Sequence, residues 1–164
     1  MPQPLDKVGC VSLDSETGLM VGGRKTDGNF VKSIYTFESK TGTFTQANNL
    51  DTPTNEMQCG KVKSGNETLA ICTGGWDGAF VSRTYWFNRS TWRLVRKTEW
   101  DLPSPEIMGR LVTSAEGRLY MVNRDDSVLE FTVEVKDGKH WHVMDWEVGH
   151  GNIAAVEVDL FQDE

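Results

Sequence analysis

The sequence has no apolar run near the ~20 residues that a helix needs to cross a bilayer. It is also poor in positive charge, with 17 Lys and Arg against 24 Asp and Glu and a net charge of −7. Surfaces that bind phosphate backbones need clustered Lys and Arg. We therefore expect no membrane span and no nucleic-acid partner.

Catalytic and cofactor motifs are missing too. There is no nucleophile elbow, no phosphate-cradling glycine loop and no zinc pattern. His140 and His142 share one face of an expected strand with His150 nearby, but no Cys or carboxylate stands at a matching spacing. Acidic residues at 14–16 and 125–126 suit turns. The sequence predicts no enzyme activity, no metal and no cofactor.

No segment carries a helical period, and short β-branched and aromatic runs alternate with Gly, Asn, Asp and Ser instead. The middle of the chain shows this best, with expected strands at 60–63, 68–73, 80–87 and around 92–95. At 38% hydrophobic residues the chain can bury a core. We expect an all-β protein.

Several features repeat about every 50 residues, which indicates a repeat architecture. Gly9, Gly60 and Gly109 begin apolar segments, 51 and 49 residues apart. The doublet Gly22-Gly23 recurs as Gly74-Gly75, 52 residues later. The other residues in phase are Pro2, Pro53 and Pro103, the aromatic residues Phe44, Trp92 and Trp141, and Val122-Asn123 in the place of a third doublet.

The pattern resembles the Kelch repeat, a β-propeller blade in which a glycine doublet ends the second strand, an aromatic lies in the third and a Trp in the fourth. The third unit lacks the doublet, and Phe44 replaces the first Trp. The resemblance implies a Kelch-type β-propeller fragment of the galactose oxidase-like superfamily over residues 1–164. The matching residues are Gly22-Gly23, Phe37 and Phe44; Gly74-Gly75, Phe87 and Trp92; and Val122-Asn123, Phe131 and Trp141.

The resemblance places three four-stranded antiparallel blades at about 8–50, 58–102 and 108–146, and one further strand at about 152–161. Kelch propellers are expected to have six or seven blades. Either further blades of a longer protein complete the ring, or two copies pair into a six-bladed ring, because open blade faces are apolar and need cover. The further strand either starts a fourth blade or closes the ring.

By resemblance, Kelch domains bind partner proteins through the loops after the second and fourth strands, and variable loops on a rigid scaffold suit recognition. We expect a non-catalytic protein-binding module. The alternative is a fragment of a galactose oxidase-like or other propeller enzyme whose active site lies outside this chain. Trp76 either anchors the partner or packs under its own loop. The expected binding residues are Arg24, Lys25, Asn29, Trp76, Asp77, Arg124 and Asp125.

The cysteines and two sequons bear on the compartment. A hairpin turning about residues 65–66 would place Cys59 opposite Cys72, either as a disulfide or as two buried thiols, and would leave Cys10 unpaired. Sequons begin at Asn66 and Asn88, both at expected hairpin turns. A disulfide beside two sequons favours an extracellular location, and a cytoplasmic one stays open.

Overall fold

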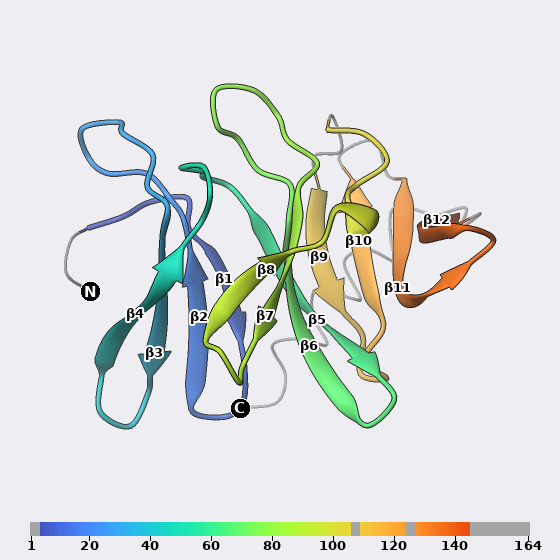
Figure 1. Cartoon of the computed structure of the whole chain (residues 1–164), viewed down its shortest axis with the longest axis horizontal. Coiled ribbons are helices and arrows are strands. Elements are labelled where there is room, and N and C mark those ends of the chain that lie inside the picture. The colour runs from blue at the N-terminus through green and yellow to red at the C-terminus, as the bar shows by residue number, and fades with distance from the viewer. Residues whose placement is uncertain (1–3, 106–108, 124–126, 145–164) are drawn as a thin grey trace, which may run out of the picture.

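The computed structural model describes residues 4–105, 109–123 and 127–144. They form three antiparallel sheets of four strands each (Figure 1), and no helix among them is long and apolar enough to cross a membrane. The strands are β1 (Gly9–Ser12), β2 (Thr17–Val21), β3 (Ser33–Glu38) and β4 (Thr43–Asn49); β5 (Gln58–Ser64), β6 (Glu67–Thr73), β7 (Thr84–Asn88) and β8 (Arg93–Arg96); and β9 (Gly109–Thr113), β10 (Leu119–Asn123), β11 (Val128–Lys136) and β12 (Lys139–Met144).

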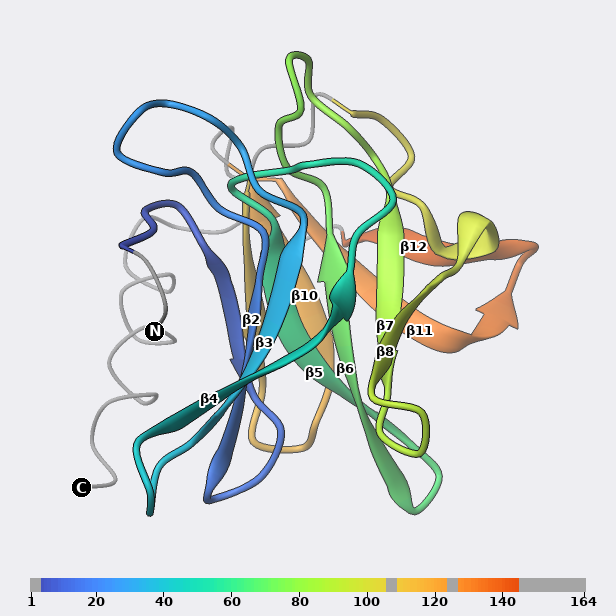
Figure 2. The same cartoon turned by 60° about the vertical axis from the view of Figure 1, so that its left-hand side comes forward.

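Each sheet follows chain order, so its four strands are joined by three consecutive hairpins. The first strands lie side by side, β1 against β5 and β5 against β9, and the sheets spread from them like a fan (Figure 2). The expectation of an all-β chain with three four-stranded units is confirmed, and the sheets are consistent with propeller blades. The described residues show no closed ring, and the expected strand at 152–161 lies outside them.

Strand register shows that the three sheets are repeats of one pattern. Phe37 pairs with Phe44 across β3 and β4, and Phe131 pairs with Trp141 across β11 and β12. In the second sheet the partner of Phe87 is Leu94, not Trp92. The predicted aromatic of the third strand therefore holds the same place in all three sheets.

The prediction of a fourth-strand Trp92 is wrong by two residues. Trp92 lies in the turn before β8 with a φ of 54° and is 45% exposed. The last turn residue before β4 is Gly42, with a φ of 66°. Trp92 therefore occupies a turn position that needs a positive φ, and the apolar place in the strand falls to Leu94.

The glycine doublets end the second strands as predicted. Gly22 and Gly74 have φ values of 62° and 68°, and Gly23 and Gly75 both have 109°. A Cβ at Gly22 would approach the Thr54 carbonyl oxygen to 2.0 Å. Only glycine fits this combination of backbone angle and close approach.

The third sheet replaces the first glycine of the doublet with Asn123. The Asn123 N–H donates to the Ser127 carbonyl at 2.9 Å, as the Gly22 and Gly74 N–H groups donate to Ser33 and Arg83 at 3.0 Å. The place of the doublet thus begins at residue 123, one residue later than the sequence pattern put it.

The evenly spaced glycines at the sheet starts are not equivalent positions. Gly9 pairs with Val21, whereas the residue that pairs with the corresponding Thr73 is Gln58. Gly60 serves a local purpose, since a Cβ there would lie 2.6 Å from Leu119 Cδ1 of the third sheet. Its role is to let neighbouring sheets approach.

Two apolar layers hold the sheets together, one in each joint between neighbouring sheets. In the second joint Trp100 of the short 3-10 helix η1 (Thr98–Trp100) meets Phe131 edge to face at 5.4 Å. Its carbonyl accepts a hydrogen bond from Trp141 Nε1 at 2.8 Å. The first layer includes Leu19, Val21, Ile34, Leu50, Cys72, Tyr85 and Phe87, and the second Val62, Ile71, Leu102, Leu119, Met121, Phe131 and Trp141.

Cys59 and Cys72 form a disulfide across β5 and β6, so of the two alternatives the bridge is confirmed. The predicted hairpin register is also correct, since Ser64 pairs with Glu67 and Cys59 with Cys72. Cys72 is fully buried in the first joint. Cys10 is free and exposed.

Candidate binding site at the loop end

The connections of the fold divide between two ends. The loops 22–32 and 74–83 and the inter-sheet connections 50–57 and 97–105 lie together at the top of Figure 1, which we call the loop end. The hairpin turns of the first two sheets and the turn between β9 and β10 lie at the bottom, which we call the turn end, whereas the turn between β11 and β12 lies at the right-hand side. The described parts of the expected binding loops are therefore gathered at one end of the molecule.

The first loop is held by backbone pairing on both sides of Arg24, which bridges to Asp6 and to Phe30. The Arg24 guanidinium donates to both carboxylate oxygens of Asp6, at 3.0 and 2.7 Å. This contact holds the pKa of Asp6 below its usual range. The bidentate contact expected of Arg24 with a partner is thus made within the chain.

The tip of this loop is a tight turn that displays Lys25 and Asn29. The Lys25 N–H donates to the Asn29 carbonyl at 2.9 Å. Asp27 Oδ1 accepts the Asn29 N–H at 3.0 Å, and this bond lowers the pKa of Asp27. The backbone is fixed, with Asn29 exposed and Lys25 half-buried.

The second loop places Trp76 where the first has Arg24, bridged to Asn55 on one side and Phe80 on the other. The Trp76 and Phe80 rings meet edge to face at 4.7 Å. Asp77 forms an ion pair with Arg83, and both side chains are largely shielded from solvent. Trp76 is half-buried within its own loop and keeps part of its ring exposed.

The third loop is only partly described. Arg124 and Asp125, two of the expected binding residues, lie outside the described residues. The loop is anchored at its start by Asn123, whose Nδ2 donates to Ser127 Oγ at 2.9 Å.

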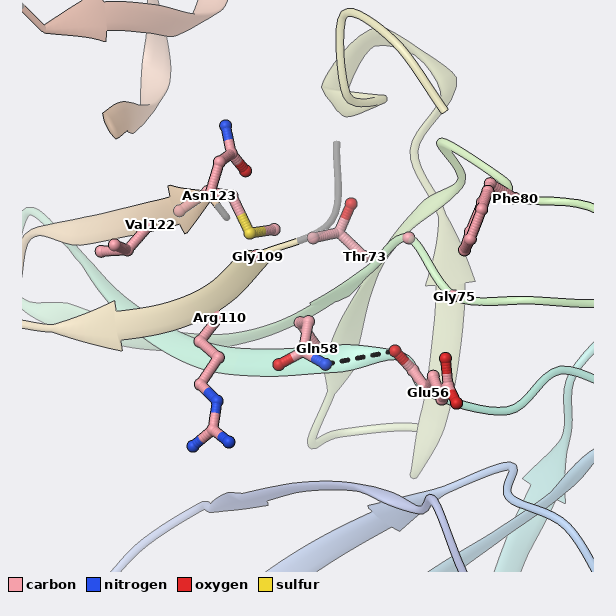
Figure 3. A pocket seen from close by; sticks show the side chains of 11 residues that line it. Glu56, Gln58, Thr73, Gly75, Phe80, Gly109, Arg110, Val122 and Asn123 are labelled. Carbon is pink, nitrogen blue, oxygen red and sulfur yellow. Dashed lines mark hydrogen bonds between the residues drawn. The ribbon is translucent and has the colours of Figure 1, made fainter. Parts of the chain in front are cut away.

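A cavity of about 380 Å³ opens at the loop end between the second and third sheets (Figure 3). Three glycines, which carry no side chain to cover the backbone, are among the residues that line it. None of the expected binding residues lines it, although it lies directly beside the loop that carries Trp76. The lining residues are Glu56, Gln58, Thr73, Gly74, Gly75, Phe80, Gly109, Arg110, Met121, Val122 and Asn123.

The polar lining combines hydrogen-bond donors and acceptors, with Arg110 as its positively charged member. Asn123 Oδ1 is buried and has no hydrogen-bond partner among the described residues. Gln58 Nε2 donates to the Glu56 carbonyl at 3.2 Å, as Figure 3 shows, and the Glu56 carboxylate is paired with Lys7. A ligand group that donates a hydrogen bond would suit Asn123 Oδ1, and one that accepts would suit Arg110.

The histidines do not form a metal site within the described chain. His140 Nδ1 lies 2.9 Å from the Thr132 carbonyl, and His142 Nε2 lies 3.3 Å from Thr132 Oγ1. Among the described residues no three His, Cys, Asp or Glu side chains gather closely enough to hold a metal ion. Both imidazoles are engaged with their own sheet.

Both sequons lie at the turn end, away from the candidate site. Asn66 is exposed in the turn between β5 and β6. Asn88 Oδ1 accepts the N–H groups of Ser90 and Thr91 at 3.0 and 3.2 Å, which fixes the turn between β7 and β8. Glycosylation at either Asn stays a prediction, and a glycan at the turn end would leave the loop end uncovered.

Sequence reasoning missed the residues that line the cavity. Glu56 and Gln58 stand in an expected binding connection, but nothing in their spacing singles them out. Asn123 could have been noticed, because it stands where the other two sheets have a glycine that makes the same backbone hydrogen bond. A polar residue at such a place indicates a local change in loop chemistry.

Comparison with known proteins adds no family assignment. No protein-family model matches the chain, and no curated protein matches it at a significant level. The account of the site therefore stands on the geometry alone.

Proposed function

We propose that this protein is a non-catalytic protein-binding module of the Kelch propeller kind, which recognises its partner at the loop end. The observation that carries the proposal is the gathering of the two described inter-strand loops and two inter-sheet connections at one end, with a cavity beside the second loop. Binding surfaces commonly combine rigid loops with an apolar anchor and a polar surround.

The two described loops are rigid in a way that favours recognition. Backbone bridges tie Arg24 to Asp6, which precedes β1, and Trp76 to Asn55 of an inter-sheet connection, so little conformational entropy would be lost on binding. Trp76 and Phe80 offer an aromatic edge beside the cavity. Lys25, Asn29 and the polar lining of the cavity supply the polar contacts.

A pull-down with the whole chain from an extract of its native source tests the proposal. The bound proteins should be lost with Trp76→Ala combined with Asn29→Ala, and retained with Thr41→Ala, an exposed turn-end residue. Circular dichroism must show that all three chains keep their strands. Because no metal takes part, exhaustive chelation should leave binding unchanged.

Retention of the same proteins by the loop variant would contradict a loop-end site. Loss of binding on chelation would contradict the non-catalytic reading and favour a metal-dependent protein.

A further inference from the structure

Each sheet has two chemically different faces, and the joints use them in a fixed order. In the second sheet, the side that packs on the first sheet is called the front face. The side that packs on the third sheet is called the back face. Since side chains alternate along a strand, register assigns the equivalent positions in every sheet. The front-face residues of the second sheet are Cys59, Cys72, Tyr85, Phe87 and Leu94.

The first sheet repeats this front face, but no described strand covers it. Its main inter-sheet contacts go to β5, β6 and β8 through the back face. The rings of Phe37 and Phe44 meet in a tilted arrangement at 4.7 Å and stay partly exposed, whereas Phe87, the counterpart of Phe37, is 2% exposed. The equivalent positions on this front face are Cys10, Met20, Tyr35, Phe37 and Phe44.

The third sheet repeats the back face. The first joint is covered from the first sheet by Val11, Leu19 and Val21. Register places Val112, Tyr120 and Val122 at the same positions of the third sheet. Two charged residues also lie on this face: Arg110, which pairs with Val122, and Glu130, which lies 3.7 Å from its counter-ion Arg118.

We propose that a second copy of this chain covers the front face of the first sheet with the back face of its third sheet. One chain thus carries both halves of a joint that it already makes twice internally. Because the two halves are different surfaces, the contact is heterologous and must either close or polymerise. Two copies close it by making the contact twice, in a ring of six sheets. This proposal is independent of what the loop end binds.

The contact makes a specific prediction for Cys10. Its counterpart Cys59 faces the first joint, where its Sγ lies 3.0 Å from the position of a Cβ on Gly9. Cys10 is exposed and is the free cysteine of the chain. A second copy would bury it, so its alkylation should be slowed at least about tenfold, since burial shields the thiolate.

Sedimentation velocity across a dilution series tests the assembly with the full chain. The expected species has twice the 18.4 kDa mass of one chain, and Cys10 alkylation should slow as it forms. A species of one chain at every concentration, or open polymers, would overturn the proposal. If Cys10 were protected to the same extent at every concentration, another part of the same chain would be covering the front face of the first sheet. That result would also overturn the proposal.

Two charge variants separate a broken contact from a broken fold. Phe44→Asp on the front face and Val112→Asp on the back face should each weaken association about a hundredfold or more, because an unpaired carboxylate would be desolvated. Thr45→Asp, exposed on the opposite side of the same strand as Phe44, should associate normally.

Mixing the two variants restores one intact contact, since each supplies the face that the other lacks. The mixture should form pairs although neither variant does so alone, and only Cys10 of the Val112→Asp copy should be protected. Failure of the mixture to pair, with both variants folded by circular dichroism, would overturn the proposal.

Discussion

The second and third sheets fill the same positions with different chemistry. The second ends β6 with Gly74-Gly75 and carries the Cys59–Cys72 disulfide. The third has Asn123 in place of the first glycine and an apolar pair, Leu111 opposite Met121, in place of the disulfide. Both keep the same strand order and register. The alternating apolar faces therefore carry the repeat, and the glycines and the disulfide are local reinforcements.

The largest effect is expected from removing the repeated aromatic of the third strand. Phe131 is 1% exposed in the second joint, so Phe131→Ala should lower the free energy of unfolding by about 3–5 kcal/mol. Phe37→Ala, at the equivalent but partly exposed place, should cost about half as much, because less apolar surface is lost. Urea unfolding at high dilution measures both. Equal losses of unfolding free energy in the two variants would contradict the account that these residues hold equivalent positions but are buried to different extents.

The disulfide should contribute less than the aromatic layer. It links residues separated by 13 positions, so Cys59→Ala combined with Cys72→Ala should lower the free energy of unfolding by about 3 kcal/mol in the chain-entropy model. The third sheet folds with Leu111 and Met121 at these places, so the variant should keep its strands. Reductant should destabilise the natural chain and leave the double variant unchanged; an effect on both would assign the loss to another cause.

The doublet can be tested against a glycine that has the same backbone need but open space. Gly75 and Gly78 have φ values of 109° and 116°. A Cβ at Gly75 would lie 2.7 Å from the Asn55 carbonyl oxygen, whereas Gly78 has nothing within 4 Å. Gly78→Ala should cost about 1 kcal/mol and Gly75→Ala about 2 kcal/mol or more, by thermal unfolding. Equal costs would show that close approach at the doublet is unimportant.

The smallest effect concerns the turn end of the first joint, where Asp14 of the first sheet pairs with Arg89 of the second. The N–H groups of Glu16 and Thr17, and then Arg89, hold the pKa of Asp14 at about 2, below the usual 3.8. A lowered pKa stabilises the fold above the unfolded value, so this stabilisation should be lost as the pH falls from about 3.8 through 2. Asp14→Asn should flatten the acid-unfolding profile in that window, because it lowers stability slightly at neutral pH, where the ionised carboxylate is stabilising, and leaves stability below a pH of about 2 almost unchanged.

The sequence predicts the fold well because turns and periodic apolar residues are local signals. The doublets Gly22-Gly23 and Gly74-Gly75, the strand aromatic Phe131 and the hairpin register of Cys59 with Cys72 were all placed correctly. The sequence pattern assigns Trp92 to the strand wrongly, because a spacing of about 50 residues does not show that a residue lies in a turn with a positive φ. Even spacing of glycines likewise does not establish equivalence, as Gly9 shows.

The candidate site was less accessible to sequence reasoning. The loops that carry Lys25 and Trp76 could be named, because loops follow from strand boundaries. The pairing of Arg24 with Asp6 and the cavity beside Gln58 depend on segments that meet only when sheets pack. Contacts of that kind leave no periodic trace in the chain.

The central claim, that three sheets repeat one register, is tested most directly by cross-strand nuclear Overhauser effects between the third and fourth strands. The account predicts Hα and amide contacts of Phe37 with Phe44, Phe87 with Leu94 and Phe131 with Trp141. Contacts of Phe87 with Trp92 in an extended strand, or a different register in any one sheet, would contradict it.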